Sequence, residues 1–330
     1  MNTVQDDSAK NRETPIRIAF GPVPSRRLGR SLGINNIPHK VCPYSCVYCQ
    51  VGRTLRFQVE PSAFYAPEAV VRAVSEKVAE SEITADYLTF VPDGEPTLDL
   101  HIGEAIEQLK PLGTRIAVIT NATLIERENV RAALHSADWV SLKIDSVREN
   151  TWKKVNRPHR RLRLQGILEG MLEFRNGYAG TLVTETMLIA GLNDGDDELN
   201  EIASFLARLA PHASYISIPT RPPAESWVLA PGEQAVARAH RILGREVERV
   251  EHLIGYEGNA FASSGNPEED LLSITAVHPM QEQAVEQLLG RTGADWSVVQ
   301  NLLDSGLLVQ TAYDGKKFFL RAFARKQASA

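Results

Sequence analysis

The sequence predicts an α/β protein with parallel strands, followed by a small second domain. Two observations predict the first part: β-rich runs alternate with helical runs from residue 31 to about residue 254, and six strand–helix units follow one another. Repeated units of this kind favour a parallel sheet with right-handed crossover connections. Periodicity alone leaves open whether the sheet is open or curved into a partial barrel. A change in composition at Ala262–Glu269, which contains Ser-Ser-Gly-Asn-Pro, predicts a linker to the second part.

The elements of the first part are predicted from hydrophobic period and from flanking turn or capping residues. The six strands are expected at Ser31–Asn36, Asp86–Val91, Arg115–Thr120, Trp139–Asp145, Thr181–Ile189 and Ser214–Ile218. The helices that follow them are expected at Pro67–Ser81, Ile102–Lys110, Arg127–His135, Leu164–Phe174, Asp197–Leu209 and Gln234–Leu243. Because parallel folds place their sites at the carboxyl ends of the strands, we expect the functional residues in the segments that follow each strand.

The second part is predicted to contain three helices and then a β-hairpin, an arrangement that resembles a winged helix. The helices are expected at Glu269–Val277, Gln283–Leu289 and Trp296–Ser305, and the strands at Leu307–Ala312 and Lys317–Phe323. Asp314-Gly315 between two alternating apolar runs is a strong hairpin signal. The chain is therefore divided into a disordered tail (1–15), a core (16–262) and a winged-helix-like domain (263–330).

Composition sets limits on compartment and partners. The 330 residues are 43% hydrophobic and 23% charged, as in ordinary soluble proteins, and the net charge of −5 offers no global attraction to nucleic acid or membrane. The polar first fifteen residues do not resemble a signal peptide, and no stretch is apolar enough to span a bilayer. We expect a cytoplasmic protein with no membrane partner.

All three cysteines of the chain fall within eight residues, as Cys42, Cys46 and Cys49 in a C-x3-C-x2-C spacing. Thiolates spaced in this way converge on a metal or an iron–sulfur cluster, and three ligands leave one position open for chemistry. A zinc site completed by His39 is the alternative. Structural zinc usually draws its ligands as two pairs from separate turns, which this single loop does not offer. The spacing therefore favours a cluster and an enzyme.

With Tyr48 directly before the last cysteine, the motif resembles the signature of the radical SAM superfamily, and the resemblance assigns cofactor binding to Tyr48. The resemblance implies one [4Fe–4S] cluster held by the three thiolates, with S-adenosylmethionine (SAM) on the fourth iron. An electron from a donor such as flavodoxin or ferredoxin then cleaves SAM to methionine and a 5′-deoxyadenosyl radical, which abstracts hydrogen from the substrate. The resemblance also implies a (β/α)6 partial TIM barrel, so the predicted fold is this partial barrel followed by the winged-helix-like domain.

Contacts to SAM are implied at the ends of the second and third predicted strands. The segment Val91–Pro96 resembles the Gly-Gly-Glu motif that binds the methionine amino group, with Asp93 in place of the first glycine. This resemblance assigns cofactor binding to Gly94, Glu95 and Pro96, and a similar likeness to Thr-Asn-Gly assigns it to Asn121. A simple proline-bracketed turn is the alternative for the first segment.

The fourth predicted strand contributes three further candidates. Alternation places Ser141, Lys143 and Asp145 on one face, where buried polar groups need partners. The resemblance implies that Lys143 binds the SAM carboxylate and that Asp145 binds a ribose hydroxyl or pairs with Lys143. A structural Lys–Asp pair is the alternative, and a Schiff base on Lys143 stays open.

Three stretches narrow the resemblance to a branch of Fe–S oxidoreductases related to wyosine-type tRNA-modifying synthetases. They cover residues 21–30, 156–159 and 219–225. The wyosine synthetases carry a second cluster on further cysteines that this chain lacks, so their reaction is not carried over.

Basic residues indicate an anionic substrate. Residues 153–163 contain six Lys or Arg and no acid, and Arg26, Arg27 and Arg30 form a second cluster. Arg157 and His159 are predicted to face the substrate, with His159 as a proton shuttle. RNA or a nucleotide is the first candidate, and a peptide or phosphorylated metabolite is the second. The alternative is a basic helix face that is exposed to solvent and has no binding role.

The charges of the second domain argue against DNA binding. Residues 268–326 contain eight acids against six bases, and the presumed recognition helix at residues 295–305 has no Lys or Arg. We expect this domain to serve protein contact, homodimerisation or substrate clamping. Two non-catalytic alternatives remain open, a zinc-stabilised winged-helix binding protein and a cluster-containing redox sensor.

Overall fold

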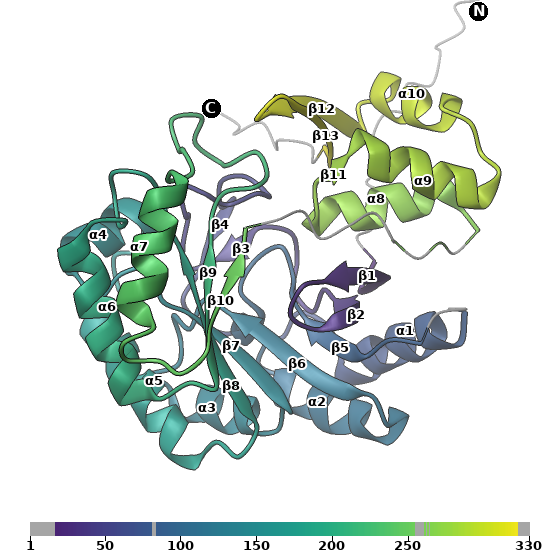
Figure 1. The fold of residues 1–330 in the computed structure, drawn as a ribbon. Coiled ribbons are helices and arrows are strands. Elements are labelled where there is room, and N and C mark those ends of the chain that lie inside the picture. The colour runs from purple at the N-terminus through teal and green to yellow at the C-terminus, as the bar shows by residue number, and fades with distance from the viewer. Residues whose placement is uncertain (1–16, 81–83, 255–260, 262, 264, 323–330) are drawn as a thin grey trace, which may run out of the picture.

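The computed structural model describes residues 17–80, 84–254, 261, 263 and 265–322, which form a curled half-barrel and a smaller unit beside it (Figure 1). The predicted tail (1–15), part of the linker and the end of the last predicted strand lie outside the described residues. The half-barrel sheet has eight strands in the order β1-β2-β5-β6-β7-β8-β9-β10. Neighbours from β2 to β10 pair in parallel, and β1 pairs antiparallel with β2. The partial barrel predicted from the sequence is confirmed.

The bounds of the elements agree closely with the sequence pattern. The strands of the large sheet are β1 (Ala19–Ser25), β2 (Gly29–Ile34), β5 (Tyr87–Phe90), β6 (Arg115–Thr120), β7 (Trp139–Lys143), β8 (Thr181–Met187), β9 (Ala213–Ser217) and β10 (Val250–Leu253). The helices are α1 (Pro67–Glu80), α2 (Ile102–Leu109), α3 (Glu128–His135), α4 (Glu149–Asn156), α5 (Leu164–Gly177), α6 (Asp196–Leu209) and α7 (Glu233–Leu243), with short 3-10 turns at Pro96–Leu98 and Lys110–Leu112. All six predicted strands and all six predicted helices of this part are present.

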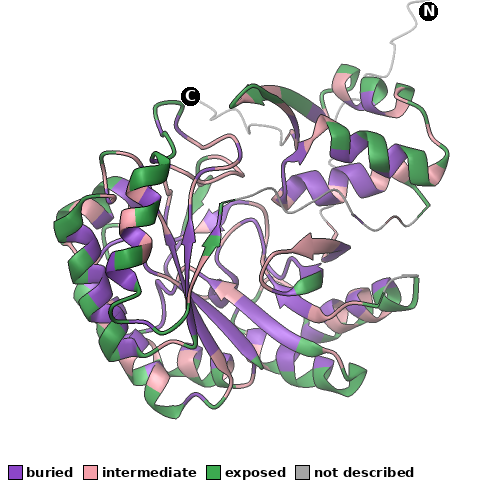
Figure 2. Ribbon diagram, in the orientation of Figure 1, coloured by how far each residue is buried: buried purple, intermediate pink, exposed green. Residues whose placement is uncertain are grey.

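The sheet is buried on both faces, as Figure 2 shows by the purple strands beneath partly green helices. Leu88, Phe90, Val140 and Leu142 are all 0% exposed. Strands of a parallel sheet lie between helices and side chains of the barrel interior, so near-continuous apolar runs are expected of them. This burial fixes the carboxyl ends of the strands rigidly, and those ends position the site.

Three elements of the half-barrel were missed by the sequence analysis. The antiparallel edge strand β1 contains two prolines and a glycine, which argue against a strand in any pattern reading. The short strand β10 carries Glu251 and His252 and completes the other edge. The helix α4 buries only Trp152 and Val155 among its apolar residues, too few to show a helical period.

The smaller unit has its own apolar core. Its elements are α8 (Pro267–Val277), β11 (Met280–Gln281), α9 (Glu282–Thr292), α10 (Ser297–Asp304), β12 (Leu308–Tyr313) and β13 (Lys316–Arg321), with sheet order β11-β13-β12. Asp314 and Gly315 have φ of 48° and 70°, which is the left-handed pair that a type I′ hairpin turn requires. Phe261 and Phe319 are fully buried in this core, and Val23 of β1 packs against it. The three predicted helices and the hairpin are present.

None of the described helices is long and apolar enough to cross a membrane.

Candidate active site

A cavity of about 350 Å³ lies at the carboxyl ends of the parallel strands. Its lining includes Pro92 after β5, Asn121 after β6, Lys143 at the end of β7 and Ile218 after β9. All three cysteines line the same cavity. The structure therefore brings the cysteine motif to the end of the sheet where parallel folds carry their sites.

The cysteine loop is held by the end of α4. The amide of Ser45 donates to the carbonyl of Asn156 at 3.0 Å, and the amide of Val47 donates to that of Val155 at 2.9 Å. Carbonyls in the last turn of a helix have no partner within the helix, so the loop amides satisfy them. The helix missed by the sequence analysis is thus the element that positions the cysteines.

Each cysteine sulfur receives one side-chain N–H donor, and each donor comes from a different part of the fold. Asn121 Nδ2 lies 3.3 Å from Cys42 Sγ, and Asn156 Nδ2 lies 3.4 Å from Cys46 Sγ. Lys40 Nζ lies 3.2 Å from Cys49 Sγ and is itself buried. Donors of this kind favour a thiolate over a thiol, and in an iron–sulfur protein they help to set the reduction potential.

The three cysteines carry no disulfide. Burial raises the pKa of the Cys42 thiol well above its ordinary value. Burial, together with the charge of Asp145, raises the pKa of Cys46 to about 12. The raised pKa values of Cys42 and Cys46 favour their thiol forms until a bound cation replaces the protons.

A single-ion site is not formed by the residues that the structure describes, since no three His, Cys, Asp or Glu side chains there are placed to share one metal ion. His39, the fourth ligand of the zinc alternative, contacts the carboxylate of Asp93 through Nδ1.

The segment after β5 packs tightly against the start of the cysteine loop. A Cβ on Gly94 would lie 2.2 Å from the carbonyl oxygen of Val41, so only glycine fits here. Glu95 is 0% exposed, and its carboxylate accepts hydrogen bonds from the Thr97 and Asn121 amides at 3.0 and 2.8 Å. Burial raises the pKa of Glu95 despite these bonds. Gly94 and Asn121 line the cavity, whereas Glu95 and Pro96 are absent from its described lining. Glu95 ties the segment after β5 to the end of β6, because its carboxylate also accepts from the Thr120 hydroxyl at 2.6 Å.

Lys143 pairs with a residue that the sequence analysis did not select. Its Nζ lies 2.6 Å from Glu185 Oε1, and Arg27 Nη1 contacts the other oxygen of the same carboxylate. Ser217 Oγ donates to Glu185 Oε1 at 3.0 Å. Burial alone would raise the pKa of Glu185, but Lys143 and Arg27 outweigh it and hold that pKa well below its ordinary value. All four of these side chains line the cavity.

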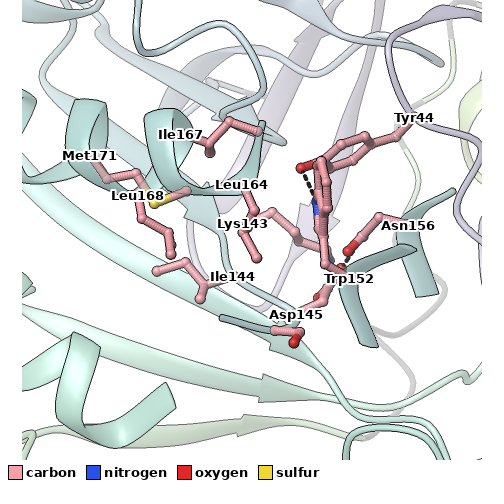
Figure 3. Close-up of a pocket in the computed structure, with 11 residues that line it drawn as sticks. Tyr44, Lys143, Ile144, Asp145, Trp152, Asn156, Leu164, Ile167, Leu168 and Met171 are labelled. Atoms are coloured by element: carbon pink, nitrogen blue, oxygen red, sulfur yellow. Dashed lines mark hydrogen bonds between the residues drawn. The ribbon is translucent and has the colours of Figure 1, made fainter. Parts of the chain in front are cut away.

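Asp145 is buried outside the described lining of this cavity, and Figure 3 shows its hydrogen bond with Asn156. Its Oδ2 accepts from the Tyr48 hydroxyl and from Asn156 Nδ2, the latter at 2.7 Å, and its Oδ1 accepts from the Met187 amide at 2.9 Å. Burial raises the pKa of Asp145 in spite of these donors. The carboxylate thus connects the tyrosine of the cysteine motif to α4 and β8.

The other predicted residues are distributed differently. Ser141 is 1% exposed on β7 and, like Asp145, is absent from the described lining of the large cavity. Arg157 and His159 are absent from that lining too. Arg157 Nη1 lies 2.5 Å from Glu225 Oε1, and the His159 amide donates to the Pro43 carbonyl at 2.8 Å. Arg157 and His159 thus contact the cysteine loop or residues next to it, outside the described cavity lining.

The smaller unit contributes one wall of the cavity. Val277 and His278, at the end of α8, belong to the lining. Gln50 donates from Nε2 to the Val277 carbonyl at 3.2 Å, and Arg221 Nη1 lies 2.9 Å from Gln50 Oε1. Arg221 Nη2 lies 2.8 Å from His278 Nε2. The residue after the last cysteine is therefore linked directly to the C-terminal unit.

Three residues of the site escaped the sequence analysis. Glu185 carried a usable signal, because a charged residue in the middle of an apolar strand needs a buried partner. Lys40 stands next to the cysteine motif, but its left-handed backbone (φ 52°), which turns the side chain toward Cys49, has no sequence signature. His278 reaches the cavity only through the packing of the two units.

Comparisons with known proteins agree with this geometry. The family model of the Radical SAM superfamily matches residues 36–206. The UPF0026 protein MJ1312 of Methanocaldococcus jannaschii is 43% identical over 311 residues, which cover 93% of this chain and 96% of that protein. A UPF0026 protein of Helicobacter pylori is 34% identical over 195 residues, 58% of this chain and 63% of that protein.

Solved structures are similar in fold. A radical SAM methyltransferase from Sphaerobacter thermophilus matches with a TM-score of 0.50 and 16% identity, over 68% of this chain and 66% of that one. TYW1 with a bound lysine-pyruvate adduct matches with a TM-score of 0.50 and 15% identity, over 67% of this chain and 76% of that one. Identities this low speak for the fold alone.

Proposed function

The chain is an enzyme of the radical SAM superfamily, and from that premise we propose that it cleaves SAM reductively and abstracts hydrogen from an anionic substrate, with RNA or a nucleotide as the first candidate. The family implies a [4Fe–4S] cluster and SAM. When bound, these groups supply a hydrogen-abstracting radical. The observation that carries the proposal is the convergence of all three cysteines on one cavity at the carboxyl end of the half-barrel.

The donor set of this cavity fits the cluster. Cys42, Cys46 and Cys49 would hold it, and each sulfur already has an N–H donor to stabilise the thiolate form. Iron–sulfur clusters are bound by thiolates, with further N–H donors to the sulfurs. The lining offers three thiols, which leaves one coordination position for an exchangeable ligand.

We assign the SAM-facing role to the predicted residues that line the cavity. Gly94 presents backbone beside the cysteine loop, and Lys143 supplies a buried ammonium suited to a carboxylate. Asn121 lines the same cavity and contacts Cys42 through Nδ2. Asp145 is assigned a positioning role, since its oxygens are already occupied by Tyr48, Asn156 and the Met187 amide. Glu95, Pro96 and Ser141 are assigned a structural role behind the cavity wall.

The charge of the cavity supports an anionic substrate. Its lining holds five Lys or Arg side chains and two carboxylates among the residues described; the cations are Arg26, Arg27, Lys40, Lys143 and Arg221, and the acids are Asp93 and Glu185. A concave surface with excess positive charge attracts phosphates and carboxylates. A protein of Flammeovirga pacifica named as an S-adenosylmethionine-dependent nucleotide dehydratase is 28% identical over 162 residues, 46% of this chain and 54% of that protein, which supports a nucleotide. A peptide or phosphorylated metabolite is the alternative.

The C-terminal unit is proposed to be a winged-helix-like clamp on this cavity and not a DNA reader. Val277 and His278 form part of the cavity wall, and Gln50 connects them to the cysteine loop. A unit that closes the site in this way would contact substrate directly.

The test is anaerobic reconstitution with iron and sulfide, reduction with dithionite and quantification of 5′-deoxyadenosine from SAM. We expect product from the wild-type protein and its loss from Cys46→Ser, because a serine hydroxyl is a harder and far less acidic group than the thiol that supplies the cluster ligand. Circular dichroism of both proteins controls for folding. Retained activity in Cys46→Ser, or binding of zinc in place of iron, would contradict the proposal.

A further inference from the structure

The outer side of the cysteine loop carries an exposed apolar pair. Leu55 is 63% exposed and Phe57 is 46% exposed, and the two lie one residue apart on the segment that follows the cysteines. Neither residue is part of the described cavity lining, which in this loop ends at Thr54. The pair therefore lies outside the described cavity lining, on a segment that pairs with the start of the cysteine loop.

Phe57 is one strand spacing away from a cysteine. The short strands β3 (Val41–Cys42) and β4 (Arg56–Phe57) pair in parallel, and their register places Phe57 opposite Cys42. Paired strands lie about 4.8 Å apart. The Gln58 amide donates to the Cys42 carbonyl at 3.4 Å, so a hydrogen bond joins the two segments directly. An exposed aromatic side chain thus lies within a few bonds of a cluster ligand.

Positive charge accompanies this pair. Arg56 and Arg160 are exposed, and among the described residues no ion pair joins either to an acid, while the nearby Glu60 pairs with Arg127 and Arg161. The Phe57 and His159 rings lie 6.3 Å apart between centroids, which places the segment of Arg160 beside β4. We call Leu55, Arg56, Phe57, His159 and Arg160 the outer face.

We propose that the outer face docks a small acidic one-electron carrier protein that reduces the cluster. The inference rests on the proposed function, because only a cluster bound by the three cysteines would need this electron. In the step the carrier is oxidised by one electron and the cluster is reduced by one, with no bond made or broken. An apolar centre with a charged rim is the usual construction of a protein docking surface, and basic residues select an acidic partner.

RNA is the other anion that such a surface could attract. The outer face is separated from the cavity by the cysteine loop, so an RNA bound there would not reach the reacting atoms. The aliphatic Leu55 also suits a protein interface better than a nucleic-acid contact, where aromatic stacking and phosphate pairing dominate. These features favour the electron carrier.

The experiment measures reduction of the reconstituted cluster by stopped-flow absorbance, with reduced flavodoxin or dithionite as alternative electron sources. For the wild-type protein we expect reduction by flavodoxin to slow as salt rises. The double variant Arg56→Glu/Arg160→Glu is expected to slow reduction by flavodoxin about tenfold or more at low salt, since electrostatic steering contributes factors of this size. Its reduction by dithionite and its iron content should match the wild type. Leu55→Ser should slow the flavodoxin reaction at every salt concentration.

The matched control is Arg241→Glu/Arg245→Glu, which makes the same change of net charge at exposed positions. These arginines lie at and beyond the end of α7, near the amino ends of the strands and away from the site. Equal slowing in both double variants, or no slowing in Arg56→Glu/Arg160→Glu, would overturn the proposal. So would loss of RNA binding in that variant with flavodoxin reduction intact. Failure of dithionite-reduced wild-type protein to cleave SAM would contradict the proposed function and leave the docking measurement valid.

Discussion

Replacing Glu185 by glutamine tests whether the Glu185 carboxylate stabilises the charged side chains that line the cavity around it. The side chain accepts from Lys143 and Ser217 and pairs with Arg27, and all of these groups are buried or nearly so. Glutamine keeps the shape and one carbonyl oxygen, but it removes the negative charge that two cations share. The perturbation is therefore electrostatic with little change in packing.

The magnitude follows from the two charges left behind. Removing one partner of a buried ion pair typically costs about 3–5 kcal/mol, because the remaining charge stays desolvated. Two charge-assisted hydrogen bonds at about 1.5–3 kcal/mol each give a similar figure. We expect Glu185→Gln to lower the free energy of unfolding by roughly 3–5 kcal/mol at pH 7. Asp86→Asn, which breaks the exposed pair with Arg30, should cost at most about 1 kcal/mol.

The pH dependence has a defined sign. The folded-state pKa of Glu185 is held below its ordinary value, so its contribution is complete above the unfolded pKa of about 4.3 and is lost progressively as pH falls from there through the folded-state pKa. The stability gap between wild type and Glu185→Gln should therefore be widest near neutral pH and shrink in acid. Adding Lys143→Met to the Glu185→Gln variant should lower the free energy of unfolding by less than Lys143→Met lowers that of the wild type. In the double variant the substitution removes an ammonium group that Glu185→Gln has left without its partner charge.

The assay is urea denaturation of the apoprotein, followed by far-ultraviolet circular dichroism, at pH 7 and at steps of decreasing pH well below the unfolded pKa of about 4.3. A loss below about 1 kcal/mol at pH 7, equal to that of Asp86→Asn, would refute the reasoning. It would mean that Lys143 and Arg27 find water or other partners when the charge of Glu185 is removed.

Two further predictions concern the cysteine loop. Lys40→Met should lower the midpoint potential of the reconstituted cluster by on the order of 50–100 mV relative to Lys40→Arg, because it removes a positive charge and an N–H donor to Cys49. Titration followed by electron paramagnetic resonance would show this, and equal potentials would count against it. Gly94→Ala should destabilise the apoprotein by at least about 2 kcal/mol, because the added methyl group would collide with the Val41 carbonyl. The control Gly290→Ala has open space on an exposed helix position and should be neutral or stabilising by up to about 1 kcal/mol in the same denaturation assay.

The fold was predictable where local pattern and tertiary structure agree. Strands buried on both faces read as apolar runs, and the helices between them show a 3.6-residue period, so six strand–helix units could be placed within a few residues. The edges could not be placed in this way. β1 is a strand in spite of its prolines because its N–H groups need pair on one side only, and its register comes from β2.

The site was predictable where one short motif carries the chemistry. Cys42, Cys46 and Cys49 are adjacent in sequence, and the structure brings them to one cavity with Tyr48. Contacts between residues distant in sequence could not be predicted in this way. Lys143 was assigned Asp145 as its pairing alternative because the two share a strand face, whereas the structure pairs it with Glu185 on the next strand. Alternation predicts which face a residue lies on, and the register of neighbouring strands decides its partner.

The difference between a local motif and partners set by the tertiary structure explains how one cysteine motif can serve different reactions. The thiols are supplied by a single loop, but their N–H donors come from the loop's own start, from the end of β6 and from α4. The cations of the cavity come from the turn after β1, the start of the cysteine loop, β7 and the segment after β9, and one wall comes from the C-terminal unit. Since hydrogen bonds and charge set the potential of a cluster, and the walls select its substrate, the reactivity of the motif depends on segments far from it in the sequence. The radical chemistry can thus be read from eight residues, while the choice of substrate depends on the packing of the whole chain.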